Sequence, residues 1–411
     1  MERDAAAAVS AVWRLEAARL VAGLTRMTHD VGLAEDLAQD ALVAALEQWP
    51  VEGIPKNPGA WLMAIAKRRA VDHFRRAETL RRRSAELGRD LSEVHVPDFD
   101  AAVDHIEDDV LRLMFLACHP ALPPESRAAL TLRLVGGLTT QEIARGFLVK
   151  DATIGQRISR AKKSLAGVDF ELPVGPDRHK RLGDVMSVIY LIFNEGYSAT
   201  AGDDWMRPDL CHEALRLARM LTTLETNEPE VFGLQALLEI QASRIRARTR
   251  DDGSPVLLED QDRRLWDQLL IRRGLAALDR AERLGRPVGP YVLQAEIAAC
   301  HARARSPEQT DWVRISELYD VLADVAPSPV VDVNRAVAHG RAFGPDAGLA
   351  VLDGLYDGAL AQSHLVPTVR GDLLARAGRA EEAAAAFREA AALTRNETER
   401  RVLLGRADEI S

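Results

Sequence analysis

The chain has 411 residues, of which 47% are hydrophobic and 28% charged, so we expect two or three folded domains. Its three cysteines are an odd, sparse set, which argues against a disulfide framework and for a reducing compartment. The N-terminal segment lacks the apolar core of a signal peptide, and the longest apolar stretch, residues 185–193, is too short to span a bilayer. We therefore expect a cytoplasmic protein with no membrane partner.

The formal net charge is −9, but the charges are segregated in the first 170 residues. Residues 67–89 carry nine basic and three acidic side chains, and residues 145–163 carry six basic and one acidic. Residues 90–109, between them, carry eight acidic side chains and no basic one. Two basic segments around an acidic connector indicate a polyanion-binding surface that the overall charge conceals.

The first part of the chain is predicted to be helical. Residues 34–49 form a helix with one acidic face, made by Glu35, Asp36, Gln39 and Asp40. A loop over residues 50–59, with three prolines and two glycines, leads into a helix over residues 60–76. That helix is basic, with Lys67, Arg68, Arg69, Arg75 and Arg76. Cations near the aromatic rings of Trp61 and Phe74 suit single-stranded nucleic acid, although large apolar rings such as these two are more often buried in a core than stacked on bases.

A second pair of helices follows the acidic connector. Thr139 and Glu142 have the spacing of a capping box, which predicts a helix start, and Asp151 is the predicted N-cap of the next helix. In that helix one arc is apolar, formed by Ile154, Ile158, Ala161 and Leu165. The outer face and its flanks can contact bases and phosphates through Thr153, Gln156, Arg157, Ser159, Arg160 and Lys163. The pattern predicts a helix-turn-helix, and the alternative is an amphipathic helix exposed to solvent.

Beyond a Pro- and Gly-containing boundary at residues 171–177, amphipathic segments separated by Pro or Gly continue to residue 411. No stretch alternates with period two, so we predict an all-α protein. Residues 341–355 and 375–393 hint at a tetratricopeptide-like repeat of helical hairpins. In the second copy, the small residues and the one bulky residue that a close helix pair needs are Gly378, Ala383, Phe387 and Ala390.

The sequence contains no phosphate-binding glycine loop, no H-E-x-x-H or C-x-x-C motif and no nucleophile elbow, so we expect no enzyme and no cofactor. Each cysteine precedes a histidine, at Cys118, Cys211 and Cys300. Adjacent residues point to different sides of a helix, and the pairs lie far apart, so we predict no metal site. Cys118 and Cys300 are expected to be buried as small apolar residues.

Three segments together resemble regions two and four of a bacterial sigma-70 factor of the extracytoplasmic-function group. They are "AEDLAQDAL" (34–42), "NPGAWLMAIAKRRAVDHFRR" (57–76) and "LTTQEIARGFLVKDATIGQRISRAKKSL" (138–165). The rest is similar to the helical extension of one subgroup, which ends in tetratricopeptide-like repeats. The segments behind that similarity are "VIYLIFNEGYSAT" (188–200), "LLEDQDRRLWD" (257–267), "PSPVVDVNRAVA" (327–338) and "GRAEEAAAAF" (378–387).

The resemblance implies a domain plan and a role for each part. Region two would occupy residues 1–87, the acidic linker 88–109, region four 110–170 and the helical extension 178–411. The protein would be a sigma factor that binds core RNA polymerase, through its β′ clamp and β flap, and promoter DNA. The extension would regulate activity in cis or bind a protein or peptide partner.

The resemblance also implies a role for each group of residues. The β′ clamp would bind Glu35, Asp36, Gln39 and Asp40. The minus-ten element would meet Lys56, Asn57, Trp61, Lys67, Arg68, Arg69, Arg75 and Arg76. The minus-thirty-five element would be read by Thr153, Gln156, Arg157, Ser159, Arg160 and Lys163.

Two departures from the family pattern limit what is carried over. Many relatives have Asn at the position of Arg68 and Lys at that of Gly155. The DNA bases that those relatives prefer are therefore not expected of this chain. Two other classes fit parts of the pattern. One is a helix-turn-helix regulator with a tetratricopeptide-like sensor domain that does not bind core polymerase. The other is a helical enzyme or scaffold whose basic faces are solvated.

Overall fold

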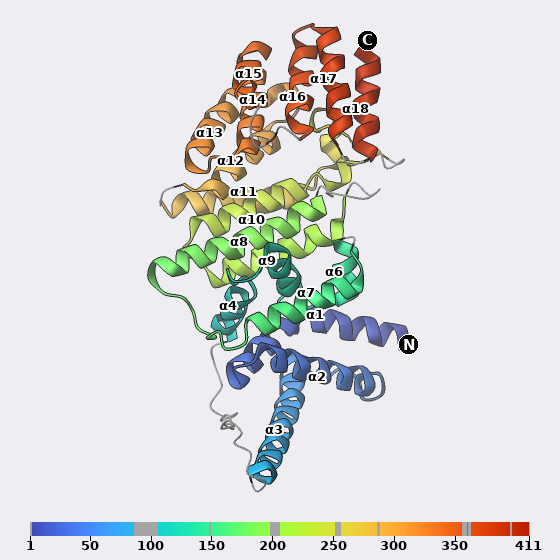
Figure 1. Cartoon of the computed structure of the whole chain (residues 1–411), viewed down its shortest axis with the longest axis vertical. Helices are drawn as coiled ribbons and strands as arrows, with labels where there is room; N and C mark the ends of the chain where they lie inside the picture. The colour runs from blue at the N-terminus through green and yellow to red at the C-terminus, as the bar shows by residue number, and fades with distance from the viewer. Residues whose placement is uncertain are drawn as a thin grey trace. The chain divides into compact units, whose positions relative to one another are not determined.

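The computed structural model describes residues 2–85, 106–147, 149–197, 206–250, 256–285, 288–355, 360, 363–394 and 397–410. Across these ranges the regular elements are eighteen α-helices and four short 3-10 helices, with no strand (Figure 1). The predicted all-α class is confirmed. The chain divides into two compact units, unit 1 at Met1–Leu191 and unit 2 at Ile192–Ser411.

Unit 1 begins with two long helices, α1 (Glu2–Thr28) and α2 (Val31–Glu52). They are joined by a tight turn in which His29 has a φ of 53°. Asp30 caps α2, because its carboxylate accepts two backbone N–H groups of the first turn at 2.7 and 3.0 Å. The cap fixes the direction in which α2 leaves the turn, and alanines and leucines bury the face between the two helices.

The loop predicted at residues 50–59 is shorter than expected, because α2 continues through Pro50. A proline in the last turn costs a helix less than one at its centre, since few hydrogen bonds follow it. The chain leaves α2 at Gly53, whose φ of 85° is the left-handed conformation that glycine adopts without strain. The long helix α3 (Pro58–Ala85) begins directly after Asn57.

Four shorter helices complete most of unit 1. They are α4 (Ile106–Ala117), α5 (Pro124–Leu134), α6 (Thr140–Gly146) and α7 (Asp151–Ser164). Helix α4 packs on α1, and α5 and α6 both pack on α7. The last four residues of the predicted linker 88–109 belong to α4, and the rest of that linker lies outside the described residues.

The predicted capping box at the start of α6 is confirmed. The Thr139 hydroxyl accepts the backbone N–H of Glu142 at 3.1 Å, and the Glu142 carboxylate accepts the N–H of Thr139 at 2.8 Å. The predicted N-cap of α7 is wrong by one residue, because Lys150 holds that position and Asp151 is the first helical residue. The carboxylate of Asp151 therefore lies in the first turn of α7, where the helix dipole favours a negative charge.

Unit 2 is a succession of helices in which neighbours along the chain pack against each other. Helix α8 (Gly175–Tyr197) runs from unit 1 into unit 2. The other α-helices are α9 (Pro208–Leu224), α10 (Pro229–Ala242), α11 (Gln268–Arg283), α12 (Pro290–Arg303), α13 (Trp312–Val325), α14 (Pro329–Phe343), α15 (Pro345–Leu352), α16 (Leu365–Arg376), α17 (Ala380–Leu393) and α18 (Glu397–Ile410). The 3-10 helices are η1 (Ile245–Ala247), η2 (Leu258–Asp260), η3 (Arg263–Leu265) and η4 (Pro307–Gln309). Five of these α-helices begin with proline, which suits the first helical position.

The last three helices pack as the sequence pattern requires. A Cβ at Gly371 of α16 would lie 2.7 Å from the ring of Phe387 on α17, so the glycine allows the two helices to approach closely. Ala383 and Ala390 are buried beside that ring, and Gly378 makes the turn before α17 with a φ of 75°. The close helix pair is confirmed, and its assignment to the tetratricopeptide repeat stays a prediction.

One carboxylate joins α10 to α12 in unit 2. Glu230 of α10 accepts the backbone N–H groups of Gly289, Tyr291 and Val292 at 3.1, 2.8 and 3.2 Å. It caps the N-terminus of α12 from another helix, so the start of α12 depends on it. Burial raises the pKa of Glu230 in spite of these three hydrogen bonds.

Glu230→Gln should destabilise unit 2 by about 1–2 kcal/mol, the cost of losing a helix cap. In the variant, the side-chain amide has only one acceptor oxygen, and its NH2 group would face backbone N–H donors that it cannot accept. The free energy of unfolding in urea measures the effect. Glu381→Gln, an exposed carboxylate in the first turn of α17, is the control and should change stability by less than about 0.5 kcal/mol. Equal stability of the two variants would contradict the capping role.

Candidate nucleic-acid interface

Helix α7 separates its apolar and polar residues as the sequence predicts. Ile154, Ile158 and Ala161 are buried against the rest of unit 1. The predicted base-contacting residues lie on the remaining surface. Exposed are Gln156, Ser159, Arg160 and Lys163, and half-buried are Thr153 and Arg157. One helix therefore presents amide, hydroxyl, guanidinium and ammonium groups to solvent, a set that can hydrogen-bond base edges and phosphates.

The second basic surface comes from α3 and the loop before it. Exposed there are Lys56, Asn57, Arg68, Arg75 and Arg76, and half-buried are Trp61, Lys67 and Arg69. The Asn57 side chain accepts the N–H of Ala60 at 3.1 Å, so it also caps α3. Trp61 packs edge-on against buried Trp49, with 5.3 Å between the ring centres. Trp61 thus combines a packing role with partial exposure, and its contact with DNA stays a prediction.

The acidic face of α2 is not uniform. Asp36 and Asp40 are exposed, and Asp40 pairs with Arg69 of α3 at 3.1 Å. Gln39 is half-buried. Glu35 is only 5% exposed, and its carboxylate lies 2.6 Å from Nε of Arg133 and 2.5 Å from Nζ of Lys162. The structure therefore places three of the four residues on the surface and the fourth in an ion-pair cluster.

The burial of Glu35 differs from the acidic face predicted for residues 34–49, although the sequence contains a signal for it. Glu35 lies on the same stripe of α2 as buried Val31, Ala38 and Ala45, at helical spacing. Its partners are contributed by α5 and α7, and Arg133 is 98 residues away in sequence. A stripe position explains the burial, but no local pattern identifies partners at that distance.

Further contacts join α1 to the later helices of unit 1. The indole Nε1 of Trp13 donates to the carbonyl of Gly137 at 3.1 Å, and Arg14 pairs with Glu142 at 2.7 Å. Arg26 pairs with Asp109 of α4 at 3.2 Å. Together with the Glu35 cluster, these contacts form what we call the seam of unit 1, between α1–α2 and α4–α7.

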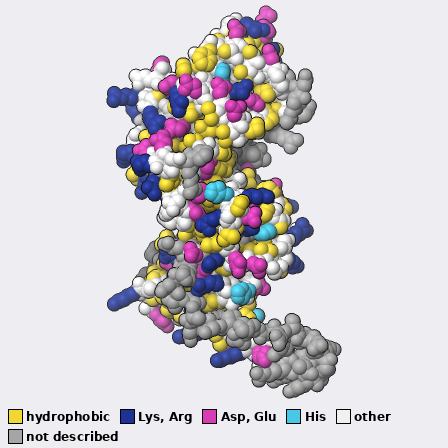
Figure 2. Space-filling model, turned by 90° about the vertical axis from the view of Figure 1, so that its left-hand side faces the viewer, with side chains coloured by type: hydrophobic (Ala, Val, Ile, Leu, Met, Phe, Trp, Pro, Cys, Tyr) yellow, Lys and Arg dark blue, Asp and Glu magenta, His cyan; other side chains and the backbone are white. Residues whose placement is uncertain are grey.

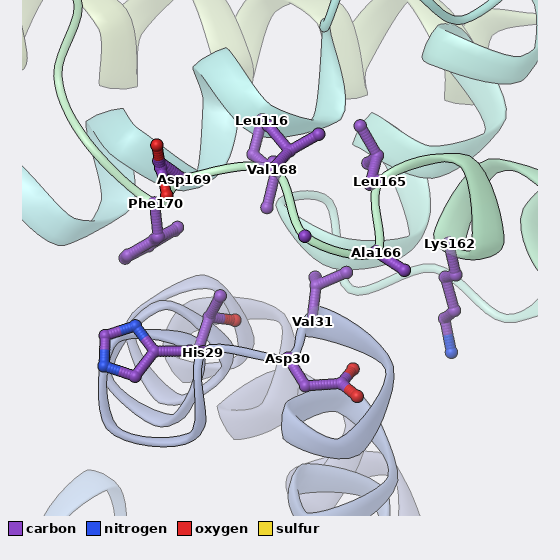
Figure 3. Close-up of a pocket in the computed structure, with 12 residues that line it drawn as sticks. His29, Asp30, Val31, Leu116, Lys162, Leu165, Ala166, Val168, Asp169 and Phe170 are labelled. Atoms are coloured by element: carbon purple, nitrogen blue, oxygen red, sulfur yellow. The ribbon is translucent and has the colours of Figure 1, made fainter. Parts of the chain in front are cut away.

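A pocket that is open to solvent lies at one edge of the seam, where His29 and Asp30 are exposed. A cavity of about 290 Å³ lies between the α1–α2 turn and the segment that follows α7 (Figure 3). His29, Asp30 and Val31 face Val168 and Phe170 across it.

The three cysteines lie in the interior of the protein. All three are buried thiols, and burial raises the pKa of Cys118 and of Cys211 to about 12. Among the described residues, no cluster of three or more His, Cys, Asp or Glu side chains could hold a metal ion.

No described helix is both long enough and apolar enough to cross a membrane. On the face drawn in Figure 2, acidic and basic side chains are interspersed.

The sequence matches three protein families. Residues 13–79 match "Sigma-70 region 2", residues 112–165 match "Sigma-70, region 4", and residues 181–282 match a family of unknown function, DUF6596. The first match contains α2 and most of α3, and the second contains α5, α6 and α7. The helices that carry the predicted interface therefore coincide with the two sigma-70 regions.

Whole proteins also resemble the chain. An uncharacterized protein of Rhizobium meliloti is 47% identical over 385 residues, which is 92% of this chain and 89% of that protein. The ECF RNA polymerase sigma factor SigK of Mycobacterium sp. (strain KMS) is 31% identical over 38% of this chain and 80% of its own length. The probable ECF RNA polymerase sigma factor SigI of Mycobacterium tuberculosis is 32% identical over 42% of this chain and 59% of its own length.

The start of α6 gives a pH-dependent prediction. Burial raises the pKa of Glu142, but hydrogen bonds from Thr139 and the Arg14 ion pair outweigh it, so the pKa lies below its ordinary value of 4.5. A lowered carboxyl pKa stabilises the fold above pH 4.5, and this stabilisation is lost as the pH falls through the lowered value. Glu142→Gln should therefore cost about 1 kcal/mol at pH 7.

The difference between the wild type and Glu142→Gln should shrink as the pH falls below 4.5. Urea unfolding midpoints between pH 7 and pH 3.5 measure it, with the exposed Glu171→Gln as the control. A difference that stays constant over this range would show that the charge of Glu142 contributes nothing.

Proposed function

The chain belongs to the extracytoplasmic-function group of sigma-70 factors, and we propose that it directs core RNA polymerase to its promoters through three surfaces of unit 1. Sigma regions two and four imply binding of core polymerase and of promoter DNA. The observation that carries the proposal is the α6–α7 pair, a capped helix-turn-helix whose second helix exposes its polar face.

In this proposal α7 reads the minus-thirty-five element in the major groove, where Gln and Arg can form paired hydrogen bonds with base edges. Helix α3 and the loop before it hold the minus-ten element. Exposed arginines there follow the backbone of the opened strand, and the exposed part of Trp61 offers a stacking surface. A factor with both surfaces recognises duplex and single-stranded DNA with separate helices.

In the same proposal, the acidic face of α2 binds the β′ clamp of core polymerase. Region four binds the β flap. Asp36 and Asp40 are exposed, so they are available without any change in the fold. Charge complementarity at such an interface mainly fixes the register and speeds the encounter. The rival function is a helix-turn-helix regulator that does not bind core polymerase, and it assigns no role to this face.

Reversing the two exposed charges, in Asp36→Arg/Asp40→Arg, should weaken binding to core polymerase by at least about tenfold, because like charges placed together cost several kcal/mol. Run-off transcription with core polymerase and promoter fragments should lose its discrete starts in parallel. Glu171→Arg, also an exposed acid in unit 1, is the matched control and should transcribe as the wild type does. Unchanged transcription by the double variant would remove α2 from the polymerase contact.

The extension is proposed to regulate the sigma regions in cis or to bind a protein or peptide partner. Its support is its size and construction, since unit 2 is a stack of paired helices, and such stacks present extended binding surfaces. The Rhizobium relative aligns over 385 residues, more than unit 1 contains, so part of the extension is shared with it. With sigma regions that act on the transcription machinery, the protein is proposed to work in the cytoplasm.

Removing residues 198–411 should alter transcription and leave binding to core polymerase intact. The cut keeps α8, because Arg181 of α8 donates to the carbonyl of Phe115 at 2.7 Å and Asp184 pairs with Arg127 at 3.1 Å inside unit 1. Run-off transcription and a core-binding titration give the two readouts. Identical promoter output from the shortened and complete proteins would contradict a regulatory extension.

A further inference from the structure

We propose that Arg341 and Arg376 form a carboxylate-binding site on unit 2, filled by the chain's own Glu259, and that an acidic segment of a partner protein binds there by displacing that glutamate. The inference deepens the proposed role of the extension as the binder of a protein or peptide, and it rests on that role. Glu259 belongs to η2, within residues 256–267, which we call the η2–η3 segment. This segment is drawn in yellow in Figure 1 and reaches the end of α16.

Two guanidinium groups from neighbouring helices converge on this one carboxylate. Arg341 of α14 donates through NH2 to Oε2 of Glu259. NH2 of Arg376, the last residue of α16, lies 2.9 Å from the same oxygen and 3.3 Å from Oε1. The two helices pack closely because α14 has a glycine, Gly340, where a Cβ would overlap Leu373 of α16. Each arginine therefore lies near the end of the first helix of a pair, α14–α15 or α16–α17, 35 residues from the other.

The site is cationic, and one of its two arginines is held independently of the carboxylate. Arg341 lies over the ring of Trp312, 5.1 Å from the ring centre, and this contact orients the guanidinium. Trp312 packs edge-on against His301, with 5.2 Å between the ring centres. Burial and the charges of three arginines lower the pKa of His301 to about 3, and these arginines are Arg244, Arg263 and Arg341. A histidine kept neutral in this way indicates a positive potential that favours an anionic ligand.

The carboxylate of Glu259 is ionised and accessible. Burial raises its pKa, but the hydrogen bond from Arg341 and the charges of Arg341 and Arg376 outweigh burial, so the pKa lies below its ordinary value of 4.5. The side chains of Glu259 and Arg376 are both 37% exposed. Ion pairs that are this exposed contribute little to stability, so a second carboxylate can replace Glu259 at small cost.

The η2–η3 segment has a separate anchor, so displacement of Glu259 does not require the whole segment to detach. NH1 of Arg263 donates to the carbonyls of His301 and Ala304 at 2.6 and 2.7 Å, at the C-terminal end of α12. Trp266 is buried beneath the same guanidinium, which lies 4.7 Å from the ring centre. The anchored part keeps the segment beside the site while the glutamate moves out of it.

The surroundings of the site favour a peptide over a nucleic acid. Leu257 and Leu265 of the η2–η3 segment are exposed to solvent. Side chains of a peptide can pack on such leucines, whereas the phosphates of a nucleic acid offer no apolar group. The partner that fits is therefore a protein segment that combines carboxylates with apolar side chains.

Hydrogen exchange of the complete protein, followed by mass spectrometry, tests the displacement with octaglutamate as the probe. The peptide should speed amide exchange over residues 256–261 by at least about threefold, because η2 loses its contact with α14 and α16. Octaglutamine, which has the same length and no charge, should leave this exchange unchanged. A readout confined to residues 256–261 separates the site from any binding of the probe to the basic helices of unit 1.

Variants test whether Glu259 competes with the peptide. Glu259→Gln removes the internal carboxylate, so fluorescently labelled octaglutamate should bind about three- to tenfold more tightly in an anisotropy titration. Asp260→Asn makes the same change of charge at the adjacent, exposed acid and should leave the affinity unchanged. Adding Arg376→Gln to Glu259→Gln should reverse the gain. Adding Arg379→Gln instead should preserve it, because Arg379 pairs with Glu382.

Equal affinity of Glu259→Gln and Asp260→Asn for octaglutamate, or exchange in the wild type that the peptide does not change, would overturn the proposal. Displacement by an oligothymidylate of eight nucleotides, but not by octaglutamate, would overturn it as well, since the site would then bind phosphate. These measurements contain no polymerase, so the sigma-factor function can stand if they fail. Unchanged transcription after removal of residues 198–411 would instead remove the regulatory role and leave the carboxylate site standing.

Discussion

The buried carboxylate of Glu35 constrains the arrangement of unit 1. Removing a charge from water costs several kcal/mol unless charged partners offset the loss. Glu35 is 5% exposed, and its two cationic partners come from α5 and α7. The burial of Glu35 therefore depends on α5 and α7 lying against α2.

The same arrangement leaves most of the residues proposed to contact DNA and polymerase exposed and covers one of them. The polar face of α7 and the arginines of α3 remain in solvent, together with Asp36 and Asp40. One acid of the same helix face, Glu35, is withheld.

Local chemistry made much of the structure predictable. The capping box of Thr139 and Glu142 and the apolar arc of α7 are determined by residues three to four apart, and both are confirmed. The N-cap prediction at Asp151 is wrong by one residue, because the position of a cap depends on the backbone turn before it. The pairing of Glu35 could not be predicted, since a stripe position reveals burial while distant partners such as Arg133 depend on how whole helices pack.

The most direct test of the central claim is run-off transcription by the purified complete protein with bacterial core polymerase on a pool of promoter fragments. Discrete transcription starts that require the protein are predicted, because regions two and four supply both the polymerase contact and the promoter contacts. Sequence-specific DNA binding by the protein alone, with no complex with core polymerase and no transcripts, would contradict the account and favour a helix-turn-helix regulator.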